Sequence, residues 1–231
     1  MKTARKRRSA PQARSIAKRA LILEASTRHF AEHGFANSRA EDIAAKLKIA
    51  KGSIFQHFKS KEGLFFEAYK KAVLSLPAYL DAPQSVKEKG YFETVRYWLT
   101  RTEEFMHKDW VPFRIAVLGD YGTDVKLRRD IERFLADNDP YGSTAFVRWG
   151  IERGEVRDDI DVEMLVYTMD WMTERFQDAL MNEELDPGLF RKQGSGKPLN
   201  ARPRIEQFLT LLRGAIGAGR AAASREAGRE S

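Results

Sequence analysis

The sequence predicts an all-α protein, and two observations carry this prediction. Apolar residues recur every three or four positions along most of the chain, which is the spacing of one helix face. The segment 91–107 shows the pattern clearly, with Phe92, Val95 and Leu99 at this interval. No stretch alternates apolar and polar residues as a half-buried strand does, and no two-residue hairpin signal is present.

The composition is that of a globular protein, with 42% hydrophobic and 32% charged residues in 231. This length allows one or two domains and a sizeable core. The absence of cysteine excludes disulfides, thiolate metal sites and a cysteine nucleophile. No apolar run approaches the roughly 18 to 20 residues of a membrane span, and none is long enough for a signal-peptide core. We therefore expect a cytoplasmic protein without a bound cofactor or metal.

The first helix is expected from Ser15 to His33. Ile22 and Phe30 lie on its inner face, and Gly34 ends it, because glycine readily takes the left-handed conformation found at helix ends. Residues 1–15 before it are basic, carry no acidic residue and show no periodicity. Such a segment is expected to be disordered in the free protein.

Two short helices separated by a tight turn are predicted between residues 38 and 58. Ser38 and Glu41 have the spacing of a capping box, which starts the first of the two. The second begins near Ala50, and Ile54 and Phe58 lie four residues apart on its inner side. Each helix is too short to be stable alone.

The outer face of the second short helix has an unusual composition. Gly52, Ser53, Phe55 and Gln56 are turned outward there, and lysines flank the helix at positions 51 and 61. A glycine that weakens a helix is useful where the backbone must approach a partner closely. Two short helices, a turn and a polar face flanked by cations are typical of a helix-turn-helix, whose second helix enters the DNA major groove.

The charge distribution supports a nucleic-acid partner. Residues 1–61 hold 15 Lys or Arg against 4 Asp or Glu, a net charge of +11. Residues 62–231 hold 25 against 29, a net charge of −4. Basicity confined to the helix-turn-helix segment is the electrostatic footprint that phosphate binding requires. The basic segment 1–15 is then either a solvated tail or an arm that adds phosphate or minor-groove contacts.

The rest of the chain is expected to be helical. A fourth helix starts at Lys61 and stops at Pro77, and Asp139 and Pro140 begin a later helix that ends at Gly154. The other helices are expected at 91–107, 112–120, 125–136, 162–180 and 203–216. Residues 186–202, rich in glycine and proline, are expected to form a mobile loop, and the tail 217–231 to be disordered.

The segment 162–172 is apolar on almost all sides. A helix of this kind must be covered on two faces. Either it is fully internal, or a second subunit covers one face together with the last helix. For a homodimer, the expected interface residues are Leu165, Met169, Met172, Phe208 and Leu212.

Aromatic side chains recur in the same carboxyl-terminal region. They either fill the core or line an apolar pocket for a small molecule. The candidate ligand-binding residues are Trp98, Phe105, Phe113, Trp149, Trp171 and Phe176.

An extended pattern between residues 23 and 65 resembles the DNA-binding domain of the TetR-type transcriptional regulators. It consists of Phe30, Gly34, Phe35, Ile43, Ala44, Gly52, His57, Phe58, Lys61 and Leu64. The resemblance implies a three-helix DNA-binding domain with a helix-turn-helix, followed by an all-helical ligand-binding and dimerisation domain. It also implies a homodimer with a four-helix interface, an inverted-repeat DNA site and a small-molecule inducer.

The resemblance further implies which residues contact DNA. Arg39 and Lys61 would contact phosphates, Lys51 and Gly52 base edges and backbone, and Ser53, Phe55, Gln56 and His57 would line the groove. Gln56 can pair with adenine, Lys51 can reach guanine or a phosphate, and Phe55 can rest on a thymine methyl group. Three departures from the family, Ala50, Phe55 and Arg39, predict a shifted operator preference.

The sequence also bears on two other classes of function. Gly194 to Lys197 faintly resemble a phosphate loop, but Arg191 and Pro198 stand where a glycine and a Ser or Thr are needed. An enzyme is therefore not expected. A ligand-independent architectural DNA-binding protein is the alternative to a ligand-responsive repressor. The expected domains are a basic tail (1–15), the helix-turn-helix domain (16–60), the ligand-binding and dimerisation domain (61–216) and a second tail (217–231).

Overall fold

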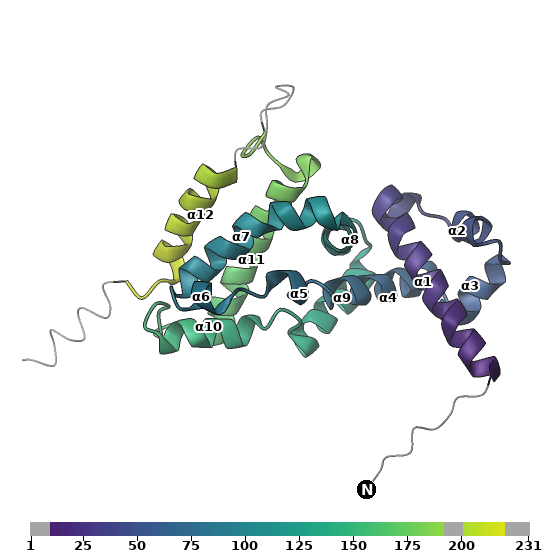
Figure 1. Ribbon diagram of the computed structural model, residues 1–231, viewed down its shortest axis with the longest axis horizontal. Coiled ribbons are helices and arrows are strands. Elements are labelled where there is room, and N and C mark those ends of the chain that lie inside the picture. Colours follow the sequence, from purple (N-terminus) through teal and green to yellow (C-terminus); the bar gives the residue numbers. More distant parts are fainter. Residues whose placement is uncertain (1–9, 192–200, 220–231) are drawn as a thin grey trace, which may run out of the picture. The chain divides into compact units, whose positions relative to one another are not determined.

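The computed structural model describes residues 10–191 and 201–219 and confirms the all-α prediction (Figure 1). Within these ranges every regular element is a helix, apart from an isolated bridge between Val156 and Gly217. The chain divides into two compact units. The described residues up to Ser75 and the segment Val111–Asp137 form the first unit, and Leu76–Trp110 with the described residues from Asn138 onward form the second. The expected boundary after residue 60 therefore does not coincide with the boundary between the units.

The first unit contains the two short helices expected from the sequence. Its elements are α1 (Ala10–Asn37), α2 (Ala40–Leu47), α3 (Lys51–Phe58), α4 (Lys61–Val73), α8 (Trp110–Tyr121) and α9 (Val125–Asn138). Phe30 and Phe65 meet edge to face at 5.2 Å in its core, and Phe35 meets Phe65 at 5.1 Å. These aromatic contacts join α1 to α4, and α2 and α3 are packed against the same core by Ile43 and Ile54.

The first helix is longer than expected. It begins at Ala10, five residues before Ser15, so residues 10–15 are helical and the prediction of disorder is wrong for them. Pro11 lies in the first turn, where its missing N–H is not needed for the helix. Gly34, with φ of 77°, breaks the helical geometry where the sequence predicts the end. Residues 1–9, the remainder of the expected tail, lie outside the described part of the chain.

The predicted capping box at Ser38 is not formed. The residue at the N-cap position of α2 is Arg39, and it makes no side-chain capping hydrogen bond. The Ser38 hydroxyl instead donates to the Gly34 carbonyl at 2.7 Å, because the break at Gly34 leaves this oxygen free of its helical partner. Glu41 is bound by Lys51, and the Ser38 N–H that it was expected to bind donates to the Phe35 carbonyl.

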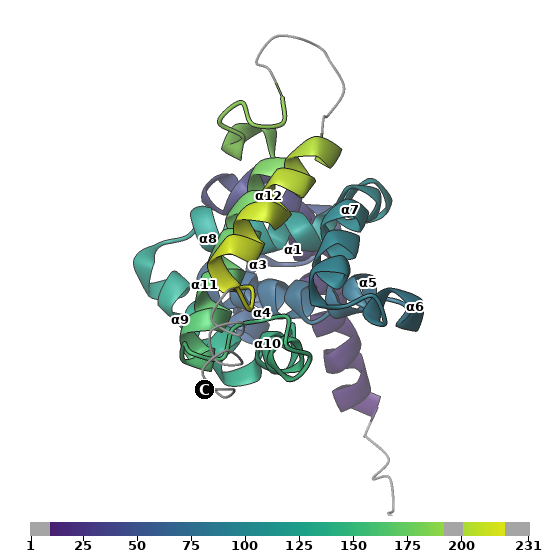
Figure 2. The same cartoon turned by 90° about the vertical axis from the view of Figure 1, so that its left-hand side faces the viewer.

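The second unit surrounds a separate hydrophobic core. Its elements are α5 (Pro77–Leu80), α6 (Gln84–Lys87), α7 (Tyr91–Lys108), α10 (Ser143–Glu152), α11 (Val162–Met181), η1 (Glu183–Leu185) and α12 (Ala201–Ile216). Helix α12 packs against α7 and α11, and α10 packs against α11 (Figures 1 and 2). Three leucines are fully buried in this core: Leu99 of α7, Leu165 of α11 and Leu212 of α12.

Asp139 caps a helix that begins later than predicted. Helix α10 starts at Ser143, after a turn in which Asp139 and Gly142 have φ of 37° and 67°. The Asp139 carboxylate accepts hydrogen bonds from the backbone N–H of Ser143 (2.8 Å) and Thr144 (3.3 Å). The carboxylate thus satisfies the first amides of the helix from outside it.

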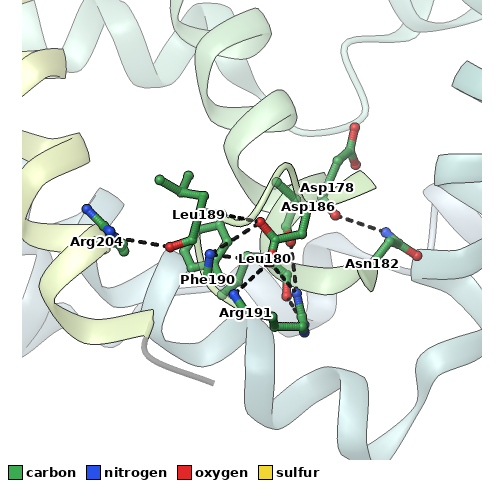
Figure 3. A network of polar contacts seen from close by, with 9 residues as sticks. Asp178, Leu180, Asn182, Asp186, Leu189, Phe190, Arg191 and Arg204 are labelled. Atoms are coloured by element: carbon green, nitrogen blue, oxygen red, sulfur yellow. Dashed lines mark hydrogen bonds and ion pairs between the residues drawn. The ribbon is translucent and has the colours of Figure 1, made fainter. Parts of the chain in front are cut away.

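The expected mobile loop is fixed over its first six residues, 186–191 (Figure 3). The buried Asp186 carboxylate accepts from the backbone N–H of Leu189 at 2.6 Å and of Arg191 at 2.8 Å. The Arg191 guanidinium donates to the carbonyls of Ala179 and Leu180 at the end of α11. Residues 192–200 lie outside the described part, and the last two residues of the expected loop, 201 and 202, begin α12.

The first residues of the expected carboxyl-terminal tail are also paired. The backbone N–H of Arg157 donates to the Ile216 carbonyl, and that of Ala218 donates to the Glu155 carbonyl, both at 2.9 Å. These two bonds hold the end of α12 beside residues 155–157. Residues 220–231 of the tail lie outside the described ranges. No helix in the described residues is long and apolar enough to cross a membrane.

Replacing Asp186 by asparagine tests the anchor at the end of α11. Burial opposes ionisation of this carboxyl, but the N–H bonds from Arg191, Phe190 and Leu189 outweigh it and lower its pKa. The substitution is expected to lower the free energy of unfolding by about 1 to 3 kcal/mol at pH 7, measured by urea denaturation. Because the folded pKa is depressed, the carboxylate contributes fully above its unfolded pKa of about 4, and this contribution is lost as the pH falls below it.

The matched control is Glu183→Gln, which changes an exposed carboxylate in the neighbouring 3-10 helix. It is expected to leave the free energy of unfolding unchanged, both at pH 7 and below pH 4. An equal loss in the two variants would show that Asp186 acts through net charge and does not act as an anchor.

Candidate nucleic-acid interface

The turn between α2 and α3 is built from backbone bonds. Lys48 ends α2 in the left-handed conformation (φ 54°), and its N–H and that of Ile49 donate to the carbonyls of Ala45 and Ala44. Helix α3 then starts at Lys51, and Ala50 at its N-cap position supplies no side-chain cap. The first amides of α3 therefore receive no side-chain cap, and the Ser53 N–H donates to the Ala50 carbonyl at 2.9 Å instead.

Helix α3 buries one side and exposes the other. Ile54 and Phe58 are buried, whereas Lys51, Gly52 and Gln56 are exposed. Ser53 and His57 are half-buried beside the exposed residues. The structure therefore places the predicted contact residues of this helix around an open face.

Phe55 is an exception, because its ring is half-buried and packs against the core of the first unit. The Lys51 ammonium stands 5.6 Å from the centre of this ring. The Phe55 ring therefore supports Lys51 as well as bordering the exposed face.

The two predicted phosphate-binding residues outside α3 lie at the starts of neighbouring helices. Arg39 is exposed at the N-cap position of α2, and Lys61 is the first residue of α4. The Lys61 ammonium donates to the Ala36 carbonyl at 3.2 Å and stands 4.5 Å from the Phe35 ring centre. Lys61 is thus held beside the segment that leads to Arg39.

Lys51 is held by a carboxylate of the preceding helix. Its ammonium forms an ion pair with Glu41, and both side chains are about half-exposed. The Lys51 hydrogen bond lowers the pKa of Glu41. An exposed pair of this kind is weak, so a phosphate can replace Glu41 as the partner of Lys51.

Helix α1 contributes a cation that the sequence pattern did not single out. Lys18 donates from its ammonium to the Ser53 hydroxyl at 3.0 Å, across 35 residues of sequence. Arg14 lies one turn earlier on the same exposed end of α1. The only signal in the sequence was the four-residue spacing of these two cations, which is also common on solvated helix faces.

Gly52 has no internal role in the packing. A Cβ atom built on Gly52 meets no atom within 4 Å, so the fold itself would accept a larger residue. Glycine in a helix interior is less favourable than alanine by about 1 kcal/mol. An exposed glycine without a packing reason marks a place where the backbone can be approached by a partner.

The predicted ligand-binding aromatics fall into separate groups. Trp98 and Trp149 meet the ring of Phe146, at centroid distances of 4.5 and 5.5 Å. Phe176 stacks on Phe208 at 4.2 Å, and Phe105 packs against Tyr79. Phe113 belongs to the first unit, and Trp171 is exposed on α11, so these two are not brought together with the others.

The predicted dimer residues lie mostly inside one chain. Leu165, Met169, Phe208 and Leu212 are buried in the core of the second unit, and Met172 is half-buried against it. Side chains buried inside one chain are not available to a partner, and periodicity did not reveal this because α11 is apolar on both faces. The apolar side chains that α11 and α12 leave exposed are Met164, Tyr167, Trp171 and Leu211.

Two short helices, α2 and α3, pack together across a tight turn, and α3 exposes a basic and polar face. This arrangement defines a helix-turn-helix DNA-binding protein. Residues 22–68 match the family of bacterial regulatory proteins called the tetR family. Residues 22–68 therefore form a DNA-binding domain of the tetR family.

The chain is similar over most of its length to proteins named as helix-turn-helix transcriptional repressors. AcnR of Corynebacterium efficiens is 25% identical over 73% of this chain and 84% of its own. DhaR of a Mycobacterium species is 29% identical over 83% of this chain and 88% of its own. The structure of FadR from Bacillus subtilis in complex with stearoyl-CoA, 18% identical, matches the fold with a TM-score of 0.59 over 84% of this chain and 96% of that one.

Replacing Gly52 by alanine separates stability from DNA contact. The variant is expected to raise the free energy of unfolding by up to about 1 kcal/mol, because alanine favours the helix. If DNA approaches the backbone at Gly52, the added methyl group obstructs it, so affinity for DNA is expected to fall by about tenfold or more, equivalent to about 1.4 kcal/mol. Fluorescence anisotropy with a labelled duplex measures the affinity, and urea denaturation measures the stability. A more stable variant with undiminished affinity would contradict close backbone approach at Gly52.

Proposed function

We propose that the chain is a homodimeric repressor that binds an inverted-repeat operator through α3 and leaves it when a small apolar or amphipathic ligand binds the second unit. The observation that carries this proposal is the open face of α3, where Lys51, Gly52 and Gln56 are exposed over two buried anchors. The same observation favours a regulatory role over a catalytic one, and DNA as the partner favours a cytoplasmic location.

The DNA contacts proposed for this face follow from side-chain chemistry. Gln56 presents an amide that can bond both edge atoms of an adenine, and Lys51 reaches guanine or phosphate. Arg39, Lys61 and Lys18 present cations at the borders of the face, where phosphates set the register of a helix in the groove. Ser53 and His57 are proposed to line the groove, and Phe55 to contact a thymine methyl group with the exposed part of its ring.

A dimer is supported by the apolar side chains that α11 and α12 expose. Tyr167 and Trp171 lie one turn apart and are 70% and 65% exposed, and Met164 and Leu211 are also exposed. Large apolar groups gathered on two adjacent helices are typical of a protein–protein interface. A second copy of the chain would bring two α3 helices to half-sites about 34 Å apart.

A ligand is supported by the aromatic cluster of the second unit and by a relative. Trp98, Phe146 and Trp149 come from α7 and α10 and are each only partly buried in the core. FadR of Bacillus subtilis, which shares the fold, binds stearoyl-CoA. We propose that the second unit of this chain binds its ligand beside Trp98 and Trp149.

The pair Gln56→Ala and Lys61→Ala tests which residues specify the sequence. Bound duplexes are first selected from a random pool, and an inverted repeat is the expected result. Gln56→Ala is then expected to cost about 1 to 3 kcal/mol at one position of each half-site and to relax the preference there. Lys61→Ala should weaken binding to all sequences alike and reduce the salt slope by about 1. Equal binding of any duplex by the unaltered protein would identify an architectural DNA-binding protein instead.

Replacing Trp171 by glutamate tests the dimer face. A charge buried between two apolar faces is strongly unfavourable, so the variant is expected to sediment as a monomer at micromolar concentration, whereas the unaltered chain sediments as a dimer. Val125→Glu is the control, because Val125 is apolar and 77% exposed on α9, outside the proposed face. Dissociation of both variants, or of neither, would contradict the assignment of this face.

A further inference from the structure

Two contacts set the register of α7 and α11 in the second unit. The Tyr91 hydroxyl lies 2.6 Å from the Met169 sulfur, and the Gln177 side-chain amide donates to the Thr102 hydroxyl at 3.3 Å. The second contact lies later than the first in both helices, so α7 and α11 run parallel. Trp98 lies one turn before Thr102, and Thr173 one turn before Gln177. Trp98 and Thr173 therefore occupy the same level of the helix pair.

Both residues at this level carry a buried polar atom without a partner. Trp98 Nε1 and Thr173 Oγ1 are shielded from solvent, and neither forms a hydrogen bond with any described residue. Buried polar groups are satisfied in the great majority of proteins, because an unmade hydrogen bond is destabilising. Two such atoms at one level of one helix pair indicate a position that a polar group of a ligand can occupy.

A carboxyl group lies one turn before Thr173 on the same face of α11. Asp170, Thr173 and Gln177 follow each other at helical spacing, and the Ser143 hydroxyl of α10 donates to Asp170 at 3.0 Å. Burial raises the pKa of Asp170 to about 6, Ser143 opposes the shift, and the charges of Glu174 and Asp139 add to it. The Tyr91 hydroxyl, whose own pKa is raised by burial and by Asp170, is a further titratable group near it.

Helix α10 closes the third side of this level. Phe146, one turn after Ser143, places its ring 4.5 Å from the ring of Trp98 and stacks on Tyr91 at 4.3 Å. The polar atoms are thus bordered by aromatic rings, and an apolar group attached to the polar one would lie against them. Arg101, the cation on this stretch of α7, pairs one terminal nitrogen with Glu104 at 3.1 Å and stands over the ring of Phe105. Its Nε is buried without a hydrogen-bond partner among the described residues.

These groups differ in what they require of a ligand. The Trp98 N–H can only donate, so it needs an acceptor. The ionised Asp170 can only accept, so it needs a donor, and the Thr173 hydroxyl can do either. A hydroxyl group both accepts and donates. An ammonium group leaves Trp98 without a partner, and a carboxylate is repelled by Asp170.

We propose that Trp98, Thr173 and Asp170 receive the hydroxyl group of an apolar ligand between α7, α10 and α11, and that this site selects alcohols over carboxylates. The assignment rests on the proposed ligand response, and it specifies the chemistry of the polar end of the ligand.

Three probes with the same alkyl chain test the proposal. Binding of 1-octanol, octylamine and octanoate to the full chain is measured by isothermal titration calorimetry at pH 7.5. Octanol is expected to bind about tenfold or more tightly than octanoate, because the buried Asp170 carboxylate repels an anion. Octanoate that binds as tightly as octanol, or the absence of binding by octanol, would overturn the assignment.

Substitutions then identify the groups responsible. Trp98→Phe keeps an aromatic side chain, although a smaller one, and removes the N–H. The variant is therefore expected to bind octanol about tenfold more weakly and octylamine with unchanged affinity. Asp170→Asn removes the negative charge and should reduce the difference between the affinities for octanol and octanoate. Trp110→Phe, the same change at an exposed tryptophan, is the control and should alter neither affinity. Thermal unfolding of each variant verifies folding, and Thr173→Val provides a second test at the same level if Trp98→Phe is unstable. A Trp98→Phe or Thr173→Val variant that is folded and binds octanol normally would contradict the site.

The failure of this assignment is distinguishable from failure of the proposed function. Operator binding is measured by fluorescence anisotropy with and without each probe. Release by octanoate but not by octanol would overturn the head-group assignment and leave a ligand-responsive repressor. A protein that binds no operator at all would remove the proposed function itself.

Discussion

The burial of Ile54 and Phe58 is the constraint on which the candidate DNA-binding surface depends. Helix α3 has only eight residues, and a helix this short does not persist in water without packing. These two anchors, together with the aromatic contacts between α1 and α4, fix which side of α3 is covered. The remaining side must then be open, and it carries the polar and basic groups. The packing of one face of α3 thus determines which residues its opposite face exposes.

Cations are placed on this surface by weak and exchangeable contacts. Lys51 pairs with Glu41, Lys18 with the Ser53 hydroxyl, and Lys61 with the Ala36 carbonyl. In free protein these contacts hold long side chains near the positions where phosphates are proposed to bind. Because the partners of these cations are exposed or neutral, a phosphate can replace each partner with little change in the free energy of unfolding. The surface is thus ordered before binding and still available for it.

The second unit combines a well-packed apolar core with a polar layer that is incompletely satisfied. Leu99, Leu165 and Leu212 hold α7, α11 and α12 together, whereas Trp98, Thr173 and Asp170 lie where α7, α10 and α11 meet. Natural proteins tolerate such polar groups where a ligand uses them. The exposed apolar residues Tyr167 and Trp171 lie elsewhere on α11, so one helix carries both the proposed ligand contacts and the proposed partner contacts.

The sequence alone determined the all-α class, the two short helices and the polar face of α3, because helical spacing and local chemistry are written along the chain. It did not determine that Lys18 meets Ser53, that the Ser38 hydroxyl turns to Gly34, or that segment 111–137 joins the first unit. It also assigned Leu165 and Leu212 to an interface, although they fill a core. Periodicity shows that a face is apolar but not what covers it. Only the tertiary structure decided this, because packing joins residues that lie far apart in the chain.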